Sequence, residues 1–161
     1  MEKYSPIIHE INDALEKFNS LFILKEHHVS LLDEKEFFNK LFFTNLTNTL
    51  WKDQLWPNGD KRGVYFLFGV NEKNSLESGL YIGKASLTSK IGIRLYTHLT
   101  GYRDSEHYFM NDGRGNRYIL EMLTTISLED KLVYMIPALE EFLIGELKER
   151  EMNLLNVYGN C

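Results

Sequence analysis

Apolar residues recur at helical spacing near the start of the chain. Over residues 6–20 they fall on one face of a helix, at positions Ile7, Ile8, Ile11, Leu15 and Phe18. This spacing predicts an amphipathic helix whose apolar face packs on a core. A second helix is predicted over roughly 33–50, where acidic residues at the start suit the positive end of a helix dipole and Phe and Leu are frequent.

Three apolar segments rich in β-branched or aromatic residues predict strands. They are residues 64–70 (VYFLFGV), 79–84 (GLYIGK) and 117–126 (RYILEMLTTI). A polar stretch, NEKNSLES, separates the first two, and we interpret it as the loop of a hairpin. A longer polar stretch, residues 101–116, is interpreted as a mobile loop before the third strand.

Two further helices are predicted, over about 89–100 and 137–149, and the second has Pro137 at its first position. The resulting order of elements is typical of an α+β fold. We therefore expect a small three-stranded antiparallel sheet flanked by helices. Because the turn cluster WPNGDKRG precedes the first strand, residues 1–60 are interpreted as an N-terminal helical extension packed on a core unit of residues 61–161.

The composition of the 161-residue chain, with 43% hydrophobic and 25% charged residues, is ordinary for one globular domain. No apolar run approaches the length of a membrane span, and the charged, periodic N-terminus does not resemble a signal peptide. The single cysteine, Cys161, excludes an internal disulfide framework and a cysteine-based zinc site. We therefore expect a cytoplasmic protein that does not associate with membranes.

Basic residues are concentrated in the middle of an acidic chain. The net charge is −5 overall, but residues 61–103 contain seven Lys or Arg and two acids, a local charge of +5. The rest of the chain, with eleven basic and twenty-one acidic residues, carries −10. This asymmetry favours an anionic ligand at the basic block, with chance clustering on a solvated surface as the alternative.

Two tyrosines are placed symmetrically in the predicted hairpin. Gly63-Val64-Tyr65 and Tyr81-Ile82-Gly83 each join a glycine to a tyrosine across one β-branched residue. Strand alternation puts Tyr81 and Gly83 on one face, and the glycines leave room for another backbone or a phosphate to approach. The alternative is that both tyrosines are ordinary packing residues.

The helix predicted over 89–100 carries Arg94 and His98, which are four residues apart and therefore neighbours on its surface. An arginine can grip a phosphate with two hydrogen bonds, and a histidine can exchange a proton near neutral pH. For either residue, the alternative is an exposed polar flank. Glu140 falls on the apolar face of the last predicted helix, where a carboxylate is costly unless it binds a metal or pairs with a basic residue.

Together, these residues resemble the motifs of the GIY-YIG nuclease family, most of all its restriction-endonuclease branch. The resemblance covers roughly residues 61–157 and depends on six elements in the order that the family has. The elements are Gly63-Val64-Tyr65, Tyr81-Ile82-Gly83-Lys84, Arg94, His98, Glu140 within E-E-F-L-I, and Asn156 within L-L-N. The chain departs from the family in Val64, which replaces an isoleucine, and in a longer loop between the two tyrosine motifs.

The resemblance implies a metal-dependent endonuclease that hydrolyses phosphodiester bonds, with DNA as the expected substrate and one divalent cation, Mg²⁺ or Mn²⁺, as cofactor. In that interpretation Glu140 binds the cation, because hard cations take carboxylate, water and phosphate oxygens as ligands. Arg94 holds the scissile phosphate and offsets its developing charge. Tyr65 activates the attacking water.

The remaining motif residues have implied supporting roles. Tyr81 positions the water or the phosphate, and His98 accepts a proton from Tyr65 or from the water. Lys84 helps to lower the pKa of the Tyr65 phenol. Gly83 leaves space for the phosphate, and Asn156 orients the phosphate or supports the glutamate.

Other functions stay open on the sequence alone. The chain could be a catalytically inactive nucleic-acid-binding or regulatory module on the same fold, or a nuclease directed at RNA or branched DNA. Apolar residues of the second predicted helix could form a homodimer interface instead of covering the core; they are Phe37, Phe38, Leu41, Phe42, Phe43 and Leu46. The N-terminal helices and residues 101–116 are candidates for setting specificity.

Overall fold

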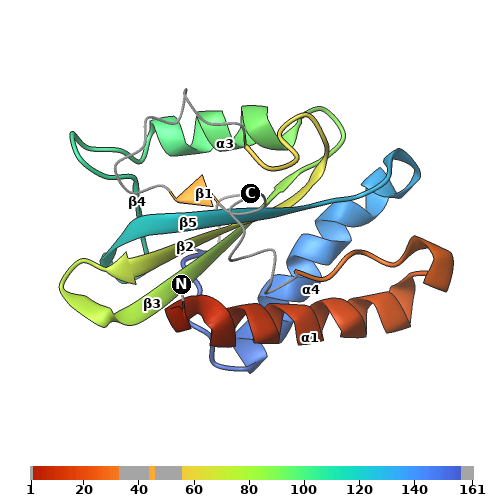
Figure 1. The fold of residues 1–161 in the computed structure, drawn as a ribbon, viewed down its shortest axis with the longest axis horizontal. Helices are drawn as coiled ribbons and strands as arrows, with labels where there is room; N and C mark the ends of the chain where they lie inside the picture. Colours follow the sequence, from red (N-terminus) through yellow and green to blue (C-terminus); the bar gives the residue numbers. More distant parts are fainter. Residues whose placement is uncertain (1, 33–43, 46–55, 157–161) are drawn as a thin grey trace.

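The computed structural model of the protein describes residues 2–32, 44–45 and 56–156, which form an α+β fold (Figure 1). The α-helices are α1 (Ser5–Phe22), α3 (Ile91–Thr100) and α4 (Ile136–Glu149). The strands are β1 (Thr44–Asn45), β2 (Gly63–Asn71), β3 (Asn74–Ala85), β4 (Phe109–Asn111) and β5 (Arg117–Ser127). Short 3₁₀ segments are η1 (Glu2–Tyr4), η2 (Lys25–His27) and η4 (Asp130–Met135).

The sheet is antiparallel, as expected, but it has more strands than the sequence predicts. The three predicted strands are β2, β3 and β5, whereas the sheet runs in the order β1-β5-β2-β3 with β4 also paired to β5. β4 lies within the polar stretch 101–116, and its three residues are too few to show an alternating pattern.

β1 also falls where the sequence predicts another structure. It occupies Thr44–Asn45, so the helix predicted over 33–50 is wrong at these two residues. The rest of that segment, including the apolar residues considered for a homodimer interface, lies outside the described residues.

The β2–β3 hairpin is longer than its sequence predicts. The polar stretch interpreted as a loop continues both strands, and only Glu72 and Lys73 connect Asn71 to its partner Asn74. The Asn71 side chain accepts a hydrogen bond of 2.9 Å from the Lys73 backbone N–H, which stabilises the turn. Because the tip of the hairpin is exposed, its polar composition hides the strand in the sequence.

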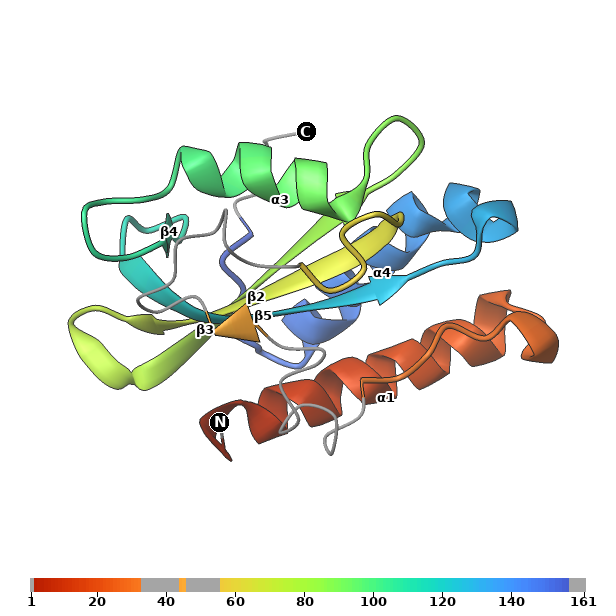
Figure 2. The same ribbon diagram turned by 45° about the horizontal axis from the view of Figure 1, so that its top comes forward.

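Helices cover both faces of the sheet (Figure 2). α1 and α4 cover the face on which Val64, Phe66 and Phe68 are buried, and α3 covers the face on which Tyr65 and Leu67 are buried. This alternation along β2 follows from the two-residue period of a strand. β2 is apolar on both faces because it is an interior strand between two helical layers.

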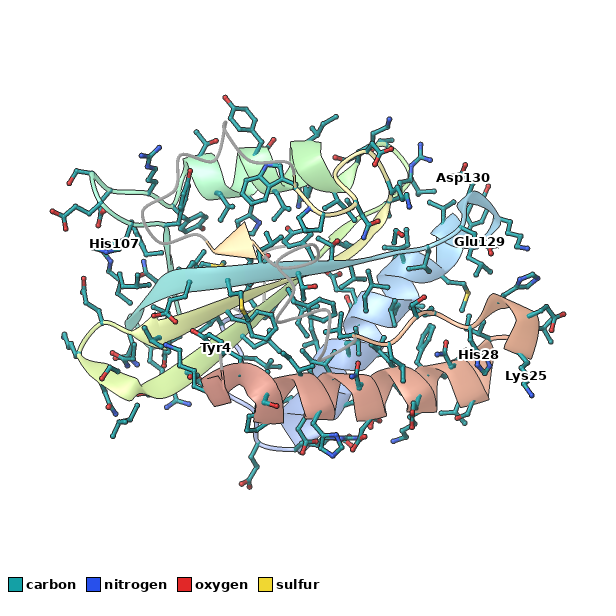
Figure 3. All side chains as sticks on the ribbon, in the orientation of Figure 1. Tyr4, Lys25, His28, His107, Glu129 and Asp130 are labelled. Carbon is teal, nitrogen blue, oxygen red and sulfur yellow. The ribbon has the colours of Figure 1, made fainter. Side chains whose placement is uncertain are left out.

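The helix predicted near the start of the chain is confirmed as α1, and its apolar stripe is part of the main core. Ile8, Ile11 and Leu15 are fully buried together with residues of α4 and β2. Tyr4, just before α1, points toward the sheet, where its ring centroid lies 5.3 Å from that of Phe68 (Figure 3). The start of the chain therefore shares its core with the tyrosine hairpin.

The helices predicted over 89–100 and 137–149 are confirmed as α3 and α4. Pro137 lies in the first turn of α4, where its missing N–H costs no helical hydrogen bond. On α3, Ile91, Leu95 and Leu99 are buried against the sheet. Within the parts of the chain that the structure describes, no helix is long and apolar enough to cross a membrane.

Candidate active site

The predicted site residues lie around β3, which is the last strand in the order of the sheet. Tyr65 and Tyr81 are on the α3 face, because Tyr65 pairs with Gly83 and Tyr81 lies two residues before Gly83 on β3. Lys84 pairs with Val64 and so belongs to the opposite face, which α4 covers. The remaining predicted residues come from the two helices: Arg94 and His98 from α3, and Glu140 from α4.

Gly83 makes room for Tyr65. A Cβ atom at position 83 would lie less than 3.0 Å from the Tyr65 ring. At Gly63, a Cβ atom would instead meet the backbone of Ile126 on β5. The expectation that Gly83 leaves space for a phosphate therefore has to be corrected, because the phenol ring of the neighbouring strand fills that space.

His98 contacts both tyrosines. Its Nδ1 atom lies 3.2 Å from the Tyr65 hydroxyl oxygen, which is within hydrogen-bond distance. Its ring packs edge-on against that of Tyr81, with centroids 4.9 Å apart and planes at 71°. The burial of Leu95 and Leu99 sets the rotation of α3, so that the half-buried His98 faces the tyrosines.

Burial makes ionisation of both phenols less favourable than in a free tyrosine, which is already neutral near neutral pH. It raises the pKa of Tyr65 well above the ordinary value, and Tyr81 adds to the rise, whereas Arg94 lowers it. Burial raises the pKa of Tyr81 to about 12, with Glu140 adding to the increase. For His98, burial and then the charge of Arg94 lower the pKa. An uncharged His98 protonated on Nε2 can accept the Tyr65 proton at Nδ1.

Glu140 is a buried carboxylate that pairs with Lys84. Only 8% of the Glu140 surface is exposed, and Lys84 Nζ donates a hydrogen bond to its Oε2 atom. Burial raises the pKa of Glu140, whereas Lys84 lowers it. The ion pair that was the alternative explanation for this carboxylate is therefore present, and its basic partner is itself a predicted site residue.

Arg94 is the cation that all of these groups share. It is exposed on α3, and its charge lowers the pKa values of Tyr65, Tyr81, His98 and Glu140. The printed contacts join His98 to Tyr65, at 3.2 Å, and to Tyr81, with ring centroids 4.9 Å apart. The charge of an anion bound at Arg94 would act on the same groups as the charge of Arg94 does.

Asn156 lies beside β3 and contacts its backbone. Residues 153–156 run along the outer edge of this strand, with a parallel bridge between Leu80 and Leu154. The Asn156 side chain extends this pairing: its Oδ1 accepts from the Ile82 N–H at 3.0 Å and its Nδ2 donates to the Ile82 carbonyl at 2.7 Å. The amide expected to orient a phosphate is thus used in holding the strand between Tyr81 and Gly83.

Glu140 is the residue that the sequence predicts to bind a divalent cation. Its burial disfavours the ionised form, which a neighbouring positive charge stabilises. Mg²⁺ and Mn²⁺ can bind through one or two carboxylates, with water and phosphate oxygens as the other ligands. Among residues 2–32, 44–45 and 56–156, the structure contains no cluster of three or more His, Cys, Asp or Glu side chains suited to a metal ion.

Tyr102 is a neighbour of the site that the sequence analysis does not identify. Its ring centroid lies 5.5 Å from that of His98, and 37% of its surface is exposed. The regular four-residue spacing of Arg94, His98 and Tyr102 is the signal that could have found it. The signal is weak because Tyr102 follows the end of α3, inside the stretch interpreted as a mobile loop.

No model of a known protein family matches the chain, and neither a curated protein nor a solved structure matches it significantly. A function for the protein therefore has to be inferred from its residue types, from their order along the chain and from the geometry of the site around β3.

Proposed function

We propose that the protein is a metal-dependent endonuclease of the GIY-YIG type, which hydrolyses phosphodiester bonds in DNA. The observation that carries the proposal is the contact of Tyr65 with His98, 3.2 Å from hydroxyl oxygen to Nδ1, within range of the charges of Arg94 and Glu140. A phenol, a neutral imidazole, a guanidinium and a carboxylate gathered from three elements, β2, α3 and α4, are the groups that this hydrolysis uses.

In the proposed reaction, Tyr65 passes a proton from the attacking water to His98. The water donates a hydrogen bond to the Tyr65 oxygen, while the Tyr65 hydroxyl donates to Nδ1 of His98. As the water oxygen bonds to phosphorus, the bond from phosphorus to the leaving oxygen breaks, the water proton moves to Tyr65 and the phenol proton moves to His98. This concerted path suits a buried tyrosine, because the raised pKa of Tyr65 makes a free phenolate costly.

Arg94 binds the scissile phosphate in this proposal. It is exposed, so it can reach a large polyanion, and its planar guanidinium can hold two phosphate oxygens at once. The charge that develops on the phosphate then lies beside a fixed cation. The ring of Tyr81, held against His98, limits where the phosphate and the water can lie.

Glu140 would hold the divalent cation, which when bound supplies positive charge to the phosphate and to the leaving oxygen. Lys84 meanwhile keeps the buried carboxylate ionised and in place through its ion pair. Asn156 fixes the edge of β3 that carries Tyr81 and Lys84.

The test is cleavage of supercoiled plasmid with Mg²⁺, with Mn²⁺ or with EDTA. We expect nicking or linearisation that requires metal and that Glu140→Ala abolishes. Glu141→Ala is the matched control, because Glu141 is the adjacent residue on α4 but is exposed, and we expect it to cut like the wild type. A folded Glu140→Ala protein that cuts at the wild-type rate would contradict the proposal.

The alternatives have distinct outcomes in the same assay. Wild-type protein that cuts branched DNA or RNA, but not plasmid, would be a nuclease with another substrate. Tight binding of nucleic acid without turnover in either metal would instead indicate a binding or regulatory module on this fold.

A further inference from the structure

A row of aromatic rings leads from the candidate site to the surface. Tyr81 and His98 have centroids 4.9 Å apart, and Tyr102 follows at 5.5 Å from His98. Phe109 on β4 lies beyond Tyr102, with centroids 6.4 Å apart and planes at 83°. Within this row Tyr81 and His98 are half-buried, whereas 37% of the Tyr102 surface is exposed. The row therefore joins the reacting groups to an accessible tyrosine.

Tyr102 is held in a defined position although it follows the end of α3. Its N–H donates to the Leu99 carbonyl at 3.0 Å, and its own carbonyl accepts from the Phe109 N–H at 2.9 Å. Phe109 in turn lies under the guanidinium of Arg117, 4.0 Å from its Cζ atom. With its backbone held and its ring in contact with His98 and Phe109, the Tyr102 side chain loses little conformational freedom when a ligand packs on it.

The stretch of chain that leads to Tyr102 is basic. From residue 78 to residue 103 the chain contains no Asp or Glu, although the protein as a whole carries −5. Lys90, Arg94 and Arg103 of this stretch are exposed. The next acid, Asp104, accepts hydrogen bonds from two backbone N–H groups and pairs with Arg117. Glu106, further along the loop, is exposed.

An exposed tyrosine with a fixed backbone, at the end of a basic stretch of chain, is suited to stacking against a nucleobase. Every base has an aromatic face, and proteins that bind single strands combine such rings with cations that follow the phosphates. In a duplex the base faces are covered by their neighbours in the stack, so this contact requires a base that is unpaired or turned out of the helix.

We propose that Tyr102 is a stacking platform for an unpaired base close to the scissile phosphate, with Arg94 and Arg103 holding phosphates of the same strand. The inference rests on the proposed function and names its substrate class: DNA in which a base beside the scissile phosphate is unpaired or turned out of the helix. The two short ring steps from Tyr81 to His98, 4.9 Å, and from His98 to Tyr102, 5.5 Å, put the stacked base beside the reacting groups.

The test measures binding without cleavage. The Glu140→Gln protein in EDTA is titrated into a short fluorescein-labelled DNA, either as a single strand or as the matched duplex, and anisotropy gives the dissociation constant. We expect tighter binding of the single strand. Tyr102→Ala should weaken single-strand binding about tenfold, the usual effect of losing one stacked base, and Tyr102→Phe should keep it.

The control is Tyr134→Ala in the same background. Tyr134 is 77% exposed in η4, so it is as accessible as Tyr102 or more so. Figure 3 shows the loop between α3 and β4, marked by His107, and the start of η4, marked by Glu129 and Asp130, at opposite ends of the molecule. We expect no change in either dissociation constant. Tyr102→Leu, which keeps an apolar side chain without a ring, should bind like Tyr102→Ala.

Two results would overturn the inference: equal binding of single strand and duplex, or single-strand binding that Tyr102→Ala leaves unchanged while the variant melts like its parent. Either could occur in a protein that cuts plasmid in a Glu140-dependent manner, in which case only the stacking platform fails. Conversely, Tyr102-dependent binding by a wild-type protein that cuts nothing would leave the platform in place and refute the nuclease.

Discussion

The ring of Tyr65 lies over Gly83 on the neighbouring strand, in the space that a side chain at position 83 would occupy. This contact explains one part of the symmetrical pattern, because the glycine of the second motif, Gly83, lies under the tyrosine of the first motif, Tyr65. Tyr65 reaches His98 across β3 because its cross-strand partner has no side chain. The glycine is thus a condition for the position of the phenol.

Gly83→Ala should therefore displace Tyr65. We expect a loss of about 1–3 kcal/mol in the free energy of unfolding, the usual cost of forcing an extra methyl group into a packed site, measured by urea denaturation. Plasmid cleavage should fall with it, because the contact with His98 is lost. Gly145→Ala is the control: its Cβ meets no atom within 4 Å, and we expect it to stabilise α4 by about 0.5–1 kcal/mol.

The charge of Arg94 should be visible in the titration of His98. Burial and Arg94 lower the pKa of His98, so Arg94→Gln should raise this pKa toward the ordinary value, as followed by NMR of the imidazole. Arg114→Gln, which removes an exposed arginine from the loop before β5, should leave it unchanged. Unchanged titration in Arg94→Gln would show that the two side chains do not interact.

The lowered pKa of His98 also determines how the stability of the protein and its proposed cleavage rate should depend on pH. Folded His98 releases its proton more readily than unfolded His98. Its contribution to the free energy of unfolding is therefore fully present above the unfolded pKa of about 6.5. That contribution is lost as the pH falls through the folded pKa. The proposed reaction uses neutral His98, so the cleavage rate should fall over the same low-pH range. His98→Gln should remove this part of the stability slope, measured by denaturation at several pH values.

Glu140→Gln should separate stability from activity. Burial raises the pKa of Glu140, so its ionised form is less favourable in the folded protein than in the unfolded chain. The contribution of Glu140 to the free energy of unfolding is therefore fully present below the unfolded pKa. It is lost as the pH rises through the folded pKa. The glutamine side chain does not ionise, so the variant avoids this loss. We expect the variant to be more stable than the wild type at neutral pH, and the two proteins to be similar in stability at acidic pH. Lys84, 36% exposed in its side chain, can still reach water.

Cleavage by Glu140→Gln should nevertheless fall by about 10²-fold or more, the size of effect seen when one electrostatic group is lost from an active site. Glu141→Gln, an exposed neighbour on α4, should change neither property. A Glu140→Gln protein that is less stable than the wild type at neutral pH would mean that the Lys84 pair outweighs the burial of the carboxylate.

Asn156→Asp should loosen the edge of β3. The substitution keeps the shape of the side chain but replaces the donor that faces the Ile82 carbonyl by an acceptor. We expect a loss of about 1–3 kcal/mol in the free energy of unfolding and faster hydrogen exchange at the Ile82 amide. Asn111→Asp, the same change at an exposed residue of β4, should have little effect on either measurement.

The amino-acid sequence by itself determined those features that depend on local periodicity. The apolar stripe that includes Ile8 and Ile11 predicts α1, because a helix repeats every 3.6 residues. The short run of apolar, β-branched and aromatic residues around Tyr65 predicts β2. The helical repeat also makes Arg94 and His98 neighbours on α3. Prediction fails where the pattern is short or wholly exposed, as in β4 and at the tip of the β2–β3 hairpin.

Only the tertiary structure decided which of the singled-out residues touch one another. Lys84 and Glu140 are far apart along the chain. They pair because α4 packs on the face of β3 opposite to α3. The space at Gly83 is filled by Tyr65 because the two strands pair in one register. Asn156 hydrogen-bonds the backbone of Ile82 because its segment runs along the outer edge of β3. Such contacts depend on the packing of whole elements, and packing follows from the shapes of many side chains together.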